Sequence, residues 1–378
     1  MSRQGFYFGA GPAALPTPVV EQAAQEFIEF DNQGVGLGEL SHRSGQATKI
    51  MNEAKAQIKE LLKVPDTHEI LFLQGGGTGG FAACLYAQAA YKFYKSNGQA
   101  KSVSGDYIVT GVWSLKALAE SKRLGIQSNV IAKAEKFVEI PKIEKVNGDF
   151  VYYCDNETVH GIEIQGEKTT PPVDFDNVCV DISSNMFSRP IDVSKYSIIF
   201  GGAQKNLGIP GVTLYIVRKD IIEAQEKVDI DQLRNAGFPV APSFLDVGLA
   251  VKNNSAYNTV SIFAIEVIKL VTARLLANGG IPEQTKISKS KAEKLYNAVD
   301  SRKDVYVTNV KPEARSRMNV VFNLKNPEDE ERFLKEATAL KLRGLKGHRS
   351  VGGIRVSNYN AVTEEACDAV VKFILDFK

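Results

Sequence analysis

The sequence has few of the residues that mark disulfide-rich, metal-binding or membrane proteins. No apolar run approaches the roughly 18 residues that a membrane-spanning helix needs, and no charged segment followed by an apolar stretch precedes Pro16. The four cysteines are widely separated and form no Cys-x-x-Cys pair, so neither a disulfide framework nor a zinc site is indicated. We expect no metal, no membrane association and a reducing, cytoplasmic location. The cysteines are Cys84, Cys154, Cys179 and Cys367.

A surplus of charge of one sign is also lacking. The 46 basic and 44 acidic side chains leave a net charge of +2, too small to attract nucleic acid or an anionic membrane. Any anion that the protein binds must therefore be held locally. Hydrophobic residues make up 44% and charged residues 24%, as in folded globular proteins. Because 378 residues exceed one typical domain, we expect two domains.

Short apolar runs alternate with helix-like stretches between residues 69 and 217. The runs are continuous and show no polar/apolar period, which is typical of strands buried on both faces of a mainly parallel sheet. Ligands of such sheets lie at the carboxyl ends of the strands, so the residues that follow each run are candidates for a site. The six runs are 69–74, 106–111, 149–154, 177–182, 196–201 and 211–217.

The remaining segments predict helices around this sheet and a smaller α+β domain after residue 279. Helices are expected over 19–28, 50–62 and 260–277, then over 280–298 and 327–340, with strands over 318–324 and 353–356. A closing helix should begin after Thr363 as its N-cap. The face of that helix that turns inward would consist of Val370, Phe373, Ile374 and Phe377.

A glycine-rich segment, residues 74–80, follows one predicted strand and opens a helix. Its free N–H groups and the helix dipole favour a phosphate there. Gly75, Gly77 and Gly80 also satisfy a dinucleotide-binding pattern, but Asp106, the nearest later acid, precedes its predicted strand instead of closing it. A turn needed only for tight strand-to-helix packing is the third interpretation.

Asp181 and Lys205 follow neighbouring apolar runs, so both should emerge at the same edge of the sheet as the glycine-rich segment. An amine that binds an aldehyde and a carboxylate that keeps a ring nitrogen protonated suit a pyridine cofactor. An ordinary ion pair would give the same pattern. Trp113, the single tryptophan, begins a helix after the run 106–111 and could stack on such a ring or fill the core.

Eight segments along the chain form a specific pattern: FGAGPAALP (8–16), SHRS (41–44), FLQGGGTGGFAA (72–83), TGVWS (110–114), YYCDNETVHGIE (152–163), VCVDISSNMFSRPIDVSKY (178–196), GGAQKNLGIPGVTLYIVRKD (201–220) and LKGHRSVGGIRVSNYNAVT (345–363). In this order they resemble the corresponding segments of phosphoserine aminotransferases, which are class-V, fold type I enzymes dependent on pyridoxal 5'-phosphate. The resemblance spans nearly the whole chain and implies an α/β fold: a large domain with a mainly parallel seven-stranded sheet, residues 16–265, and a small α+β domain, residues 266–378 with 1–15.

The resemblance also assigns roles to single residues. It implies that Lys205 is the Schiff-base lysine, Asp181 the partner of the pyridinium nitrogen and Trp113 the ring-stacking residue. Thr158 would contact the ring oxygen. The cofactor phosphate would be held by Gly77, Thr78 and Gln204, and by Asn258 and Thr259 of the neighbouring subunit of a homodimer with its active sites at the interface. Two residues depart from the family pattern: Thr78, where many relatives carry a larger residue, and Val260, where proline is usual.

The implied reaction is amino transfer between O-phospho-L-serine and 2-oxoglutarate by a ping-pong mechanism. Both substrates carry an α-carboxylate and a distal anion, which guanidinium groups bind well. The resemblance places Arg355 at the α-carboxylate, and Arg43, His348 and Arg349 at the distal anion. The alternatives are an aminotransferase for another small amino acid (serine or alanine–glyoxylate type), a cysteine desulfurase, a nucleotide-binding oxidoreductase and a non-catalytic phosphate-binding protein. The desulfurase is disfavoured because no cysteine lies in a glycine- or serine-rich loop.

Overall fold

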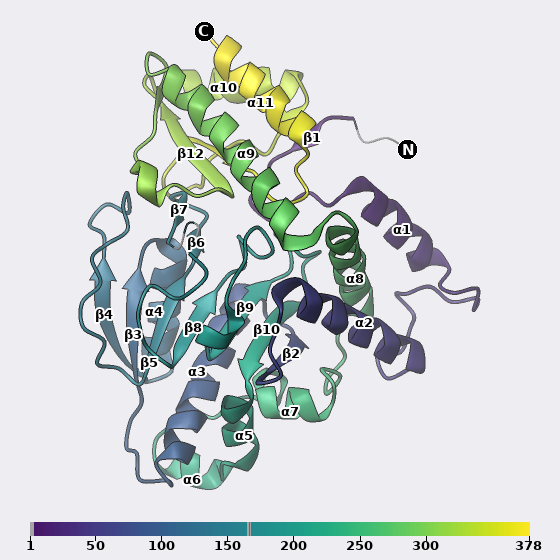
Figure 1. The fold of residues 1–378 in the computed structure, drawn as a ribbon, viewed down its shortest axis with the longest axis vertical. Helices are drawn as coiled ribbons and strands as arrows, with labels where there is room; N and C mark the ends of the chain where they lie inside the picture. Colours follow the sequence, from purple (N-terminus) through teal and green to yellow (C-terminus); the bar gives the residue numbers. More distant parts are fainter. Residues whose placement is uncertain (1–3, 165, 167) are drawn as a thin grey trace.

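A seven-stranded sheet forms the centre of the molecule and has helices on both faces (Figure 1). The structure is a computed structural model that describes residues 4–164, 166 and 168–378. β10 runs antiparallel to both of its neighbours and the other adjacent strands run parallel, which confirms the mainly parallel sheet. Across the sheet the strands are β2 (His68–Leu73), β10 (Thr213–Arg218), β9 (Ile198–Gly202), β8 (Val178–Asp181), β5 (Phe150–Cys154), β3 (Ser104–Val109) and β4 (Gln127–Lys133).

The strands are continuously apolar because each contributes side chains to two hydrophobic clusters, one on each face of the sheet. In β2, Ile70 and Phe72 belong to the cluster on one face, and Leu71 and Leu73 to the cluster on the other. Successive side chains of a strand point to opposite faces, so a sheet covered on both sides needs apolar residues at every position. The first cluster is covered by α1 (Thr17–Ile28), α2 (Gly45–Leu62) and α8 (Ile262–Ala277). The second is covered by α3 (Gly76–Lys95), α4 (Val112–Arg123), α5 (Lys219–Lys227), α6 (Ile230–Asn235) and α7 (Val247–Lys252).

A smaller layer of strands and helices lies beyond one end of the large sheet (Figure 1). Its hydrophobic cluster contains Phe8 and residues between 292 and 377. The strands are β11 (Tyr306–Val307), β12 (Asn319–Leu324) and β14 (Ile354–Ser357), and the helices are α9 (Gly280–Ser301), α10 (Asp329–Ala339) and α11 (Glu364–Asp376). The Oγ1 atom of Thr363 accepts the N–H of Ala366 at 3.1 Å, which confirms the predicted cap. All four residues predicted for the inner face of α11 are buried.

Short elements connect these layers. β1 (Phe6–Tyr7) pairs in parallel with β13 (Leu342–Arg343), so the start of the chain joins the smaller layer. β6 (Asn156–Glu157) and β7 (Ile162–Glu163) form a hairpin above the large sheet. Three single-turn 3₁₀ helices complete the described elements, at Val193–Lys195, Ser243–Leu245 and Pro312–Ala314. Within the described residues no helix is both long and apolar enough to cross a membrane.

Two sequence predictions about strands were wrong. β4 was not predicted, because it is an edge strand whose residues are largely exposed and therefore polar. Asp106 was placed before its strand but lies inside β3, close to its amino end. The carboxylate of Asp106 accepts hydrogen bonds from Asn129, Asn147 and Gly148 at 2.7–2.9 Å. It therefore has a structural role and is not placed to bind a ribose.

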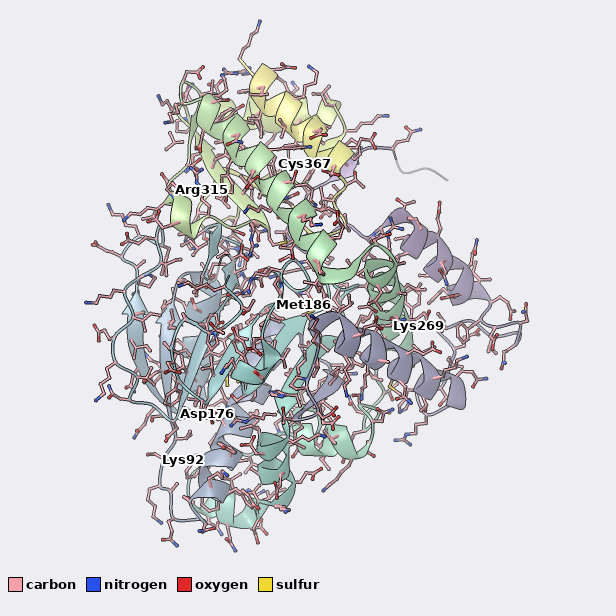
Figure 2. All side chains as sticks on the ribbon, in the orientation of Figure 1. Lys92, Asp176, Met186, Lys269, Arg315 and Cys367 are labelled. Atoms are coloured by element: carbon pink, nitrogen blue, oxygen red, sulfur yellow. The ribbon has the colours of Figure 1, made fainter. Side chains whose placement is uncertain are left out.

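A buried network of charges ties the large sheet to the smaller layer. The Glu163 carboxylate in β7 accepts from Nη2 and Nε of Arg317, just before β12, at 2.8 and 3.1 Å. The Arg189 guanidinium lies 3.5 Å from the same carboxylate and also pairs with Asp155 at the end of β5. Met186, on the same loop as Arg189, lies at the centre of the view in Figure 2. Glu163, Asp155 and Arg189 are buried and the Arg317 side chain is 12% exposed, so two cations compensate two anions with little contact with water.

Candidate active site

The residues predicted for the site meet at the carboxyl ends of the strands. Asp181 is the last residue of β8, and Lys205 lies three residues beyond β9, its neighbour in the sheet. The glycine-rich segment follows β2, which runs in the same direction as β9 because both pair antiparallel with β10. The shared edge that the sequence predicted for these three segments is therefore confirmed.

Trp113 connects several of the candidate residues. The Nζ atom of Lys205 lies 5.2 Å from the centroid of the Trp113 ring. The indole N–H donates to Oγ1 of Thr158 at 2.9 Å, and the Thr158 carbonyl accepts from Nη1 of Arg355 at 3.3 Å. One aromatic ring thus brings the amine, a hydroxyl and a guanidinium together, although they come from segments far apart in the sequence.

Asp181 is a buried carboxylate with one oxygen fixed by the protein. Its Oδ1 atom accepts from the backbone N–H and the hydroxyl of Ser183, at 2.8 and 2.6 Å. Among the described residues, no hydrogen bond reaches Oδ2. Burial raises the pKa of Asp181, and the nearby positive charge of Lys205 opposes that rise. A buried carboxylate in this state is stabilised by a further N–H donor or cation at Oδ2.

The glycine-rich segment leaves open space at the start of α3. Gly75 and Gly76 have φ angles of +104° and +57°, which favour glycine. A Cβ atom at Gly77 would meet nothing nearer than Phe81 at 4.0 Å, so the first N–H groups of the helix face free space. A Cβ at Gly80, in contrast, would lie 2.2 Å from the Phe200 ring. Tight packing therefore explains the glycine at position 80. The start of the helix, with Gly77 and the exposed Thr78, is open and could bind an anion.

Asn258 and Thr259 lie beside this turn in their own chain. The Asn258 amide donates to Oε1 of Gln74, and the Gln74 amide donates to the Thr259 carbonyl at 2.7 Å. Val260, the departure from the family pattern, is buried, and Ser261 follows it as the N-cap of α8. Burial of the Val260 side chain therefore holds the backbone here, where a proline would restrict it through its ring.

The N-terminal segment packs against the residues around Lys205. The N–H of Ala13 donates to the Gln204 carbonyl at 2.9 Å. A Cβ atom at Gly11 would lie 3.4 Å from Cγ of Lys205, and the φ angle there is +137°, so glycine suits both the space and the backbone. This segment therefore forms one wall beside the amine.

Positive charge accumulates around Trp113 without acidic partners. Among the described residues no ion pair is formed by Lys205, His348, Arg349 or Arg355, and the buried Nε of Arg355 has no hydrogen-bond partner. Burial lowers the pKa of His348, and the charges of Arg355, Arg349 and Lys116 lower it further. Burial likewise lowers the pKa of Arg355. Bound anions would relieve this accumulation of charge.

Arg43 is not part of this group within its own chain. It is exposed just before α2, whose N-cap is Ser44, with the Ser44 hydroxyl accepting from Ala47 at 3.1 Å. No contact between Arg43 and the Trp113 group is found among the described residues. The remaining candidates are brought together, and Arg43 is the exception.

Sequence reasoning missed two polar residues that position the site. Glu157 is fully buried and accepts from the backbone N–H groups of Trp113 and Ser114 at 3.0 and 2.8 Å, so it caps α4 from another strand. Asn206 donates to the Ser184 carbonyl and accepts from Asn360 N–H at 2.9 Å, which links the loops after β8 and β14. Both lie inside the resembling segments, but only the fold reveals their partners.

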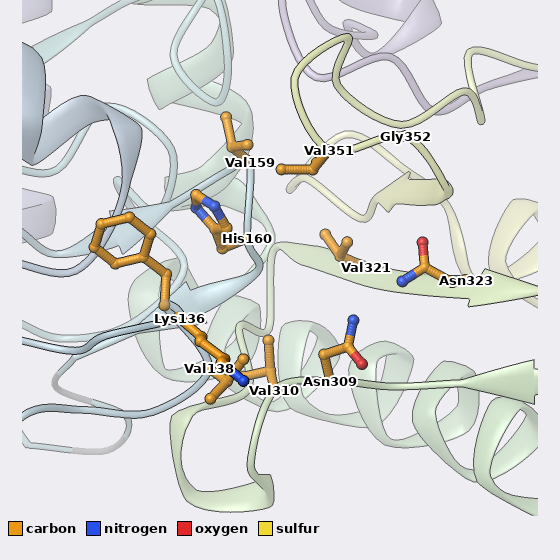
Figure 3. A pocket seen from close by; sticks show the side chains of 11 residues that line it. Lys136, Val138, Val159, His160, Asn309, Val310, Val321, Asn323, Val351 and Gly352 are labelled. Atoms are coloured by element: carbon orange, nitrogen blue, oxygen red, sulfur yellow. The ribbon is translucent and has the colours of Figure 1, made fainter.

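A separate cleft of about 210 Å³ is lined by Val159 and His160 together with residues of the smaller layer, among them Val321 and Asn323 (Figure 3). Thr158 bonds to Trp113, whereas His160 lines the cleft and packs against Phe137, with the two ring centroids 4.9 Å apart and the rings tilted by 51°. Lys205 and Asp181 do not line it. No group of acidic, histidine or cysteine side chains suited to a metal occurs among the described residues.

Comparisons with known proteins agree with this geometry. The model of the family "Aminotransferase class-V" matches residues 5–370. Phosphoserine aminotransferase of Saccharomyces cerevisiae is 45% identical over 98% of this chain and 96% of its own, and the putative enzyme of Schizosaccharomyces pombe is 41% identical with the same coverage. The solved structure of PLP-bound phosphoserine aminotransferase from Trichomonas vaginalis has a TM-score of 0.84 at 36% identity, covering 98% of this chain and 99% of that one. The chain therefore belongs to the class-V aminotransferases and, within them, to the phosphoserine aminotransferases.

Proposed function

We propose that this protein transfers the amino group between O-phospho-L-serine and 2-oxoglutarate, giving 3-phosphooxypyruvate and L-glutamate. The observation that carries the proposal is the placement of an amine, an indole ring and a buried carboxylate at one edge of the sheet, in Lys205, Trp113 and Asp181. The full-length relatives named for this reaction support it. An aminotransferase for another small amino acid would need only the α-carboxylate contact, so the additional unpaired cations favour a substrate with a distal anion.

The cofactor is pyridoxal 5'-phosphate, and the residues present fit it. Its aldehyde carbon would bind Nζ of Lys205, its ring nitrogen would face the free Oδ2 of Asp181, and Trp113 would stack on the ring beside the Thr158 hydroxyl. Its phosphate would occupy the open start of α3, held by Gly77 and Thr78, with Gln204, Asn258 and Thr259 nearby. When bound, the protonated ring withdraws electrons from the substrate Cα.

The chain's own residues supply proton transfer and orientation. The Nζ amine of Lys205 would accept the proton from the substrate Cα and hold it until it is returned to the reacting group. Asp181 keeps a proton at the ring nitrogen because a buried carboxylate stabilises the cation beside it. Arg355 would bind the α-carboxylate, and Arg43, His348 and Arg349 the distal anion, through charge-assisted hydrogen bonds.

We further propose that two copies form a homodimer with the active sites at the interface. Three exposed apolar side chains near the end of α1 support this: Phe27, Ile28 and Val35. Among the described residues Arg43 touches no other candidate residue of its own chain, so in such a dimer it would reach the active site of the partner. We place the protein in the cytoplasm, where its four buried thiols stay reduced.

The two-domain division is part of the same proposal, with residues 16–265 in the large domain and 266–378 with 1–15 in the small one; residues 1–3 lie outside the described residues. Phe8 in the cluster of residues 292–377 supports it. The apolar residues of α8 up to Leu275 join the cluster of the large domain, so this helix would be the connection between the two.

A lysine replacement tests the proposed reaction. We expect Lys205→Ala to lower amino transfer from phosphoserine by about 10²–10⁴-fold or more, because the proton carrier is lost. Lys195→Ala, at an exposed lysine just before β9, is the matched control and should transfer at the wild-type rate. Borohydride reduction followed by peptide mass spectrometry should locate the cofactor on residue 205. Native transfer by Lys205→Ala would refute the mechanism, and equal rates with serine and phosphoserine would refute the distal-anion site.

A further inference from the structure

Lys116 lies one turn after Trp113 on α4 and faces the same side of that helix. Its Nζ atom is 4.4 Å from the centroid of the Trp113 ring, closer than the Nζ atom of Lys205 at 5.2 Å. Residues three apart on a helix are neighbours on its surface, so this placement follows from the local geometry. Trp113 thus has two ammonium groups near its ring, one of which was not assigned a role by the sequence.

The charge of Lys116 also acts on the loop that carries His348 and Arg349. Arg355, Arg349 and Lys116 are the three cations that act on His348. This loop turns back on itself through the N–H of Gly352, which donates to the His348 carbonyl at 2.9 Å. Lys116 therefore lies beside the Trp113 ring, and its charge reaches the loop expected at the distal anion.

No acidic group among the described residues compensates Lys116. Within the part of the chain that the structure describes, its ammonium forms neither an ion pair nor a hydrogen bond with a side chain, and it is exposed. The carboxylate of Glu157 in β6, which caps the start of this helix, is already occupied by the N–H groups of Trp113 and Ser114. Three cationic residues, Lys116, Arg349 and Arg355, thus act on the His348 ring, which is more positive charge than a single carboxylate needs.

We propose that Lys116 is a substrate-binding residue that contacts the phosphate of phosphoserine, together with His348 and Arg349. The inference rests on the proposed function and deepens it by naming a residue that selects a phosphorylated substrate. A phosphate monoester carries nearly two negative charges above its second pKa of about 6. An extra lysine suits this group, because an ammonium binds phosphate oxygens as a point charge without a fixed direction.

The test compares Lys116→Met with Lys116→Arg and with Lys122→Met, an exposed lysine farther along the same helix. We expect Lys116→Met to lower kcat/KM for phosphoserine by about tenfold to hundredfold, the effect of one charge-assisted hydrogen bond, through KM and not kcat. Slow turnover of unphosphorylated serine should be unchanged, Lys116→Arg should recover most of the loss, and Lys122→Met should behave as wild type. The loss should be larger at pH 8 than at pH 5.5, where the phosphate is a monoanion.

A second measurement does not depend on turnover. The His348 ring can be titrated by NMR among only four histidines, and Lys116→Met should raise its pKa while Lys122→Met leaves it unchanged. Equal losses with serine and phosphoserine would mean that Lys116 only supports Trp113, and no loss with either would place it outside the site; both overturn the inference. Failure of the wild-type protein to use phosphoserine would instead refute the proposed function, so the two failures are distinguishable.

Discussion

Replacing Glu163 with glutamine should destabilise the whole protein, although Glu163 touches no candidate catalytic residue. Glu163→Gln keeps the shape of the side chain and removes its charge. The carboxylate is buried and binds Arg317 through Nη2, Nε and the backbone N–H at 2.8–3.1 Å, with Arg189 at 3.5 Å. After the change, the guanidinium of Arg317 would lose its carboxylate partner, and the buried guanidinium of Arg189 would keep only Asp155.

The size of the effect follows from burial. Removing one partner from a buried ion pair costs about 3–5 kcal/mol, because a charge is left without compensation. At about 2.1 cal/mol/K per residue, 378 residues give an unfolding entropy near 0.8 kcal/mol/K, so the melting temperature should fall by about 4–6 °C. The exposed Glu60 on α2 offers a matched control, and Glu60→Gln should change the melting temperature by less than 1 °C.

The loss of stability caused by Glu163→Gln should also depend on pH. Burial alone would raise the pKa of Glu163, but Arg317 and Arg189 outweigh burial and lower it. A lowered carboxyl pKa contributes stability above the unfolded value of about 4.5 and loses it as the pH falls through the folded value. Thermal unfolding followed by circular dichroism at pH 7 and pH 4 should therefore show the two proteins converging at acid pH. A melting temperature of Glu163→Gln equal to that of Glu60→Gln at pH 7 would refute the reasoning.

Two further changes test other parts of the structure. Thr158→Val leaves the indole N–H of Trp113 without its 2.9 Å acceptor, so we expect a stability loss of about 1–3 kcal/mol and an altered emission spectrum of the single tryptophan; unaltered emission would contradict the hydrogen bond. Lys291 is buried, donates to the carbonyls of Tyr359 and Val362 at 3.0 and 2.6 Å, and has a pKa lowered by burial to about 8. Because the folded chain releases this proton more readily than the unfolded chain, wild-type stability should rise between about pH 8 and pH 10.5, and denaturant titrations should show no such rise for Lys291→Met. Lys303→Met, at an exposed site, should keep the rise, and an identical pH profile for Lys291→Met would count against the assigned pKa.

Strand ends explain why part of the site could be predicted from the sequence. Asp181 and Lys205 each follow an apolar run, and parallel strands bring their carboxyl ends to one edge, so neighbouring runs suffice to place the two residues together. Thr363 is equally local, since a cap is bonded within three residues. Trp113 was ambiguous, because core filling and ring stacking give the same sequence signal.

The residues that were missed depend on contacts between distant segments. Glu157 caps α4 across 44 positions of sequence, and Asn206 meets Asn360 across 154. From the sequence alone, a buried polar residue cannot be distinguished from an exposed one, because its hydrogen-bond partner is unknown. β4 was missed for the opposite reason, because an edge strand exposes polar side chains and lacks the continuous apolar run that identified the others.

Two segments, one near each end of the chain, meet beside the candidate site. The Tyr359 hydroxyl donates to the Ala10 carbonyl at 2.8 Å, and residues 6 and 7 pair with 342 and 343. A chain emerging from the ribosome can therefore assemble its large sheet early, but the wall beside Lys205 must wait until nearly the last residue has been synthesised. Activity should thus appear as an all-or-none event late in biogenesis, and a protein shortened at either end should keep much of its helix content while remaining inert.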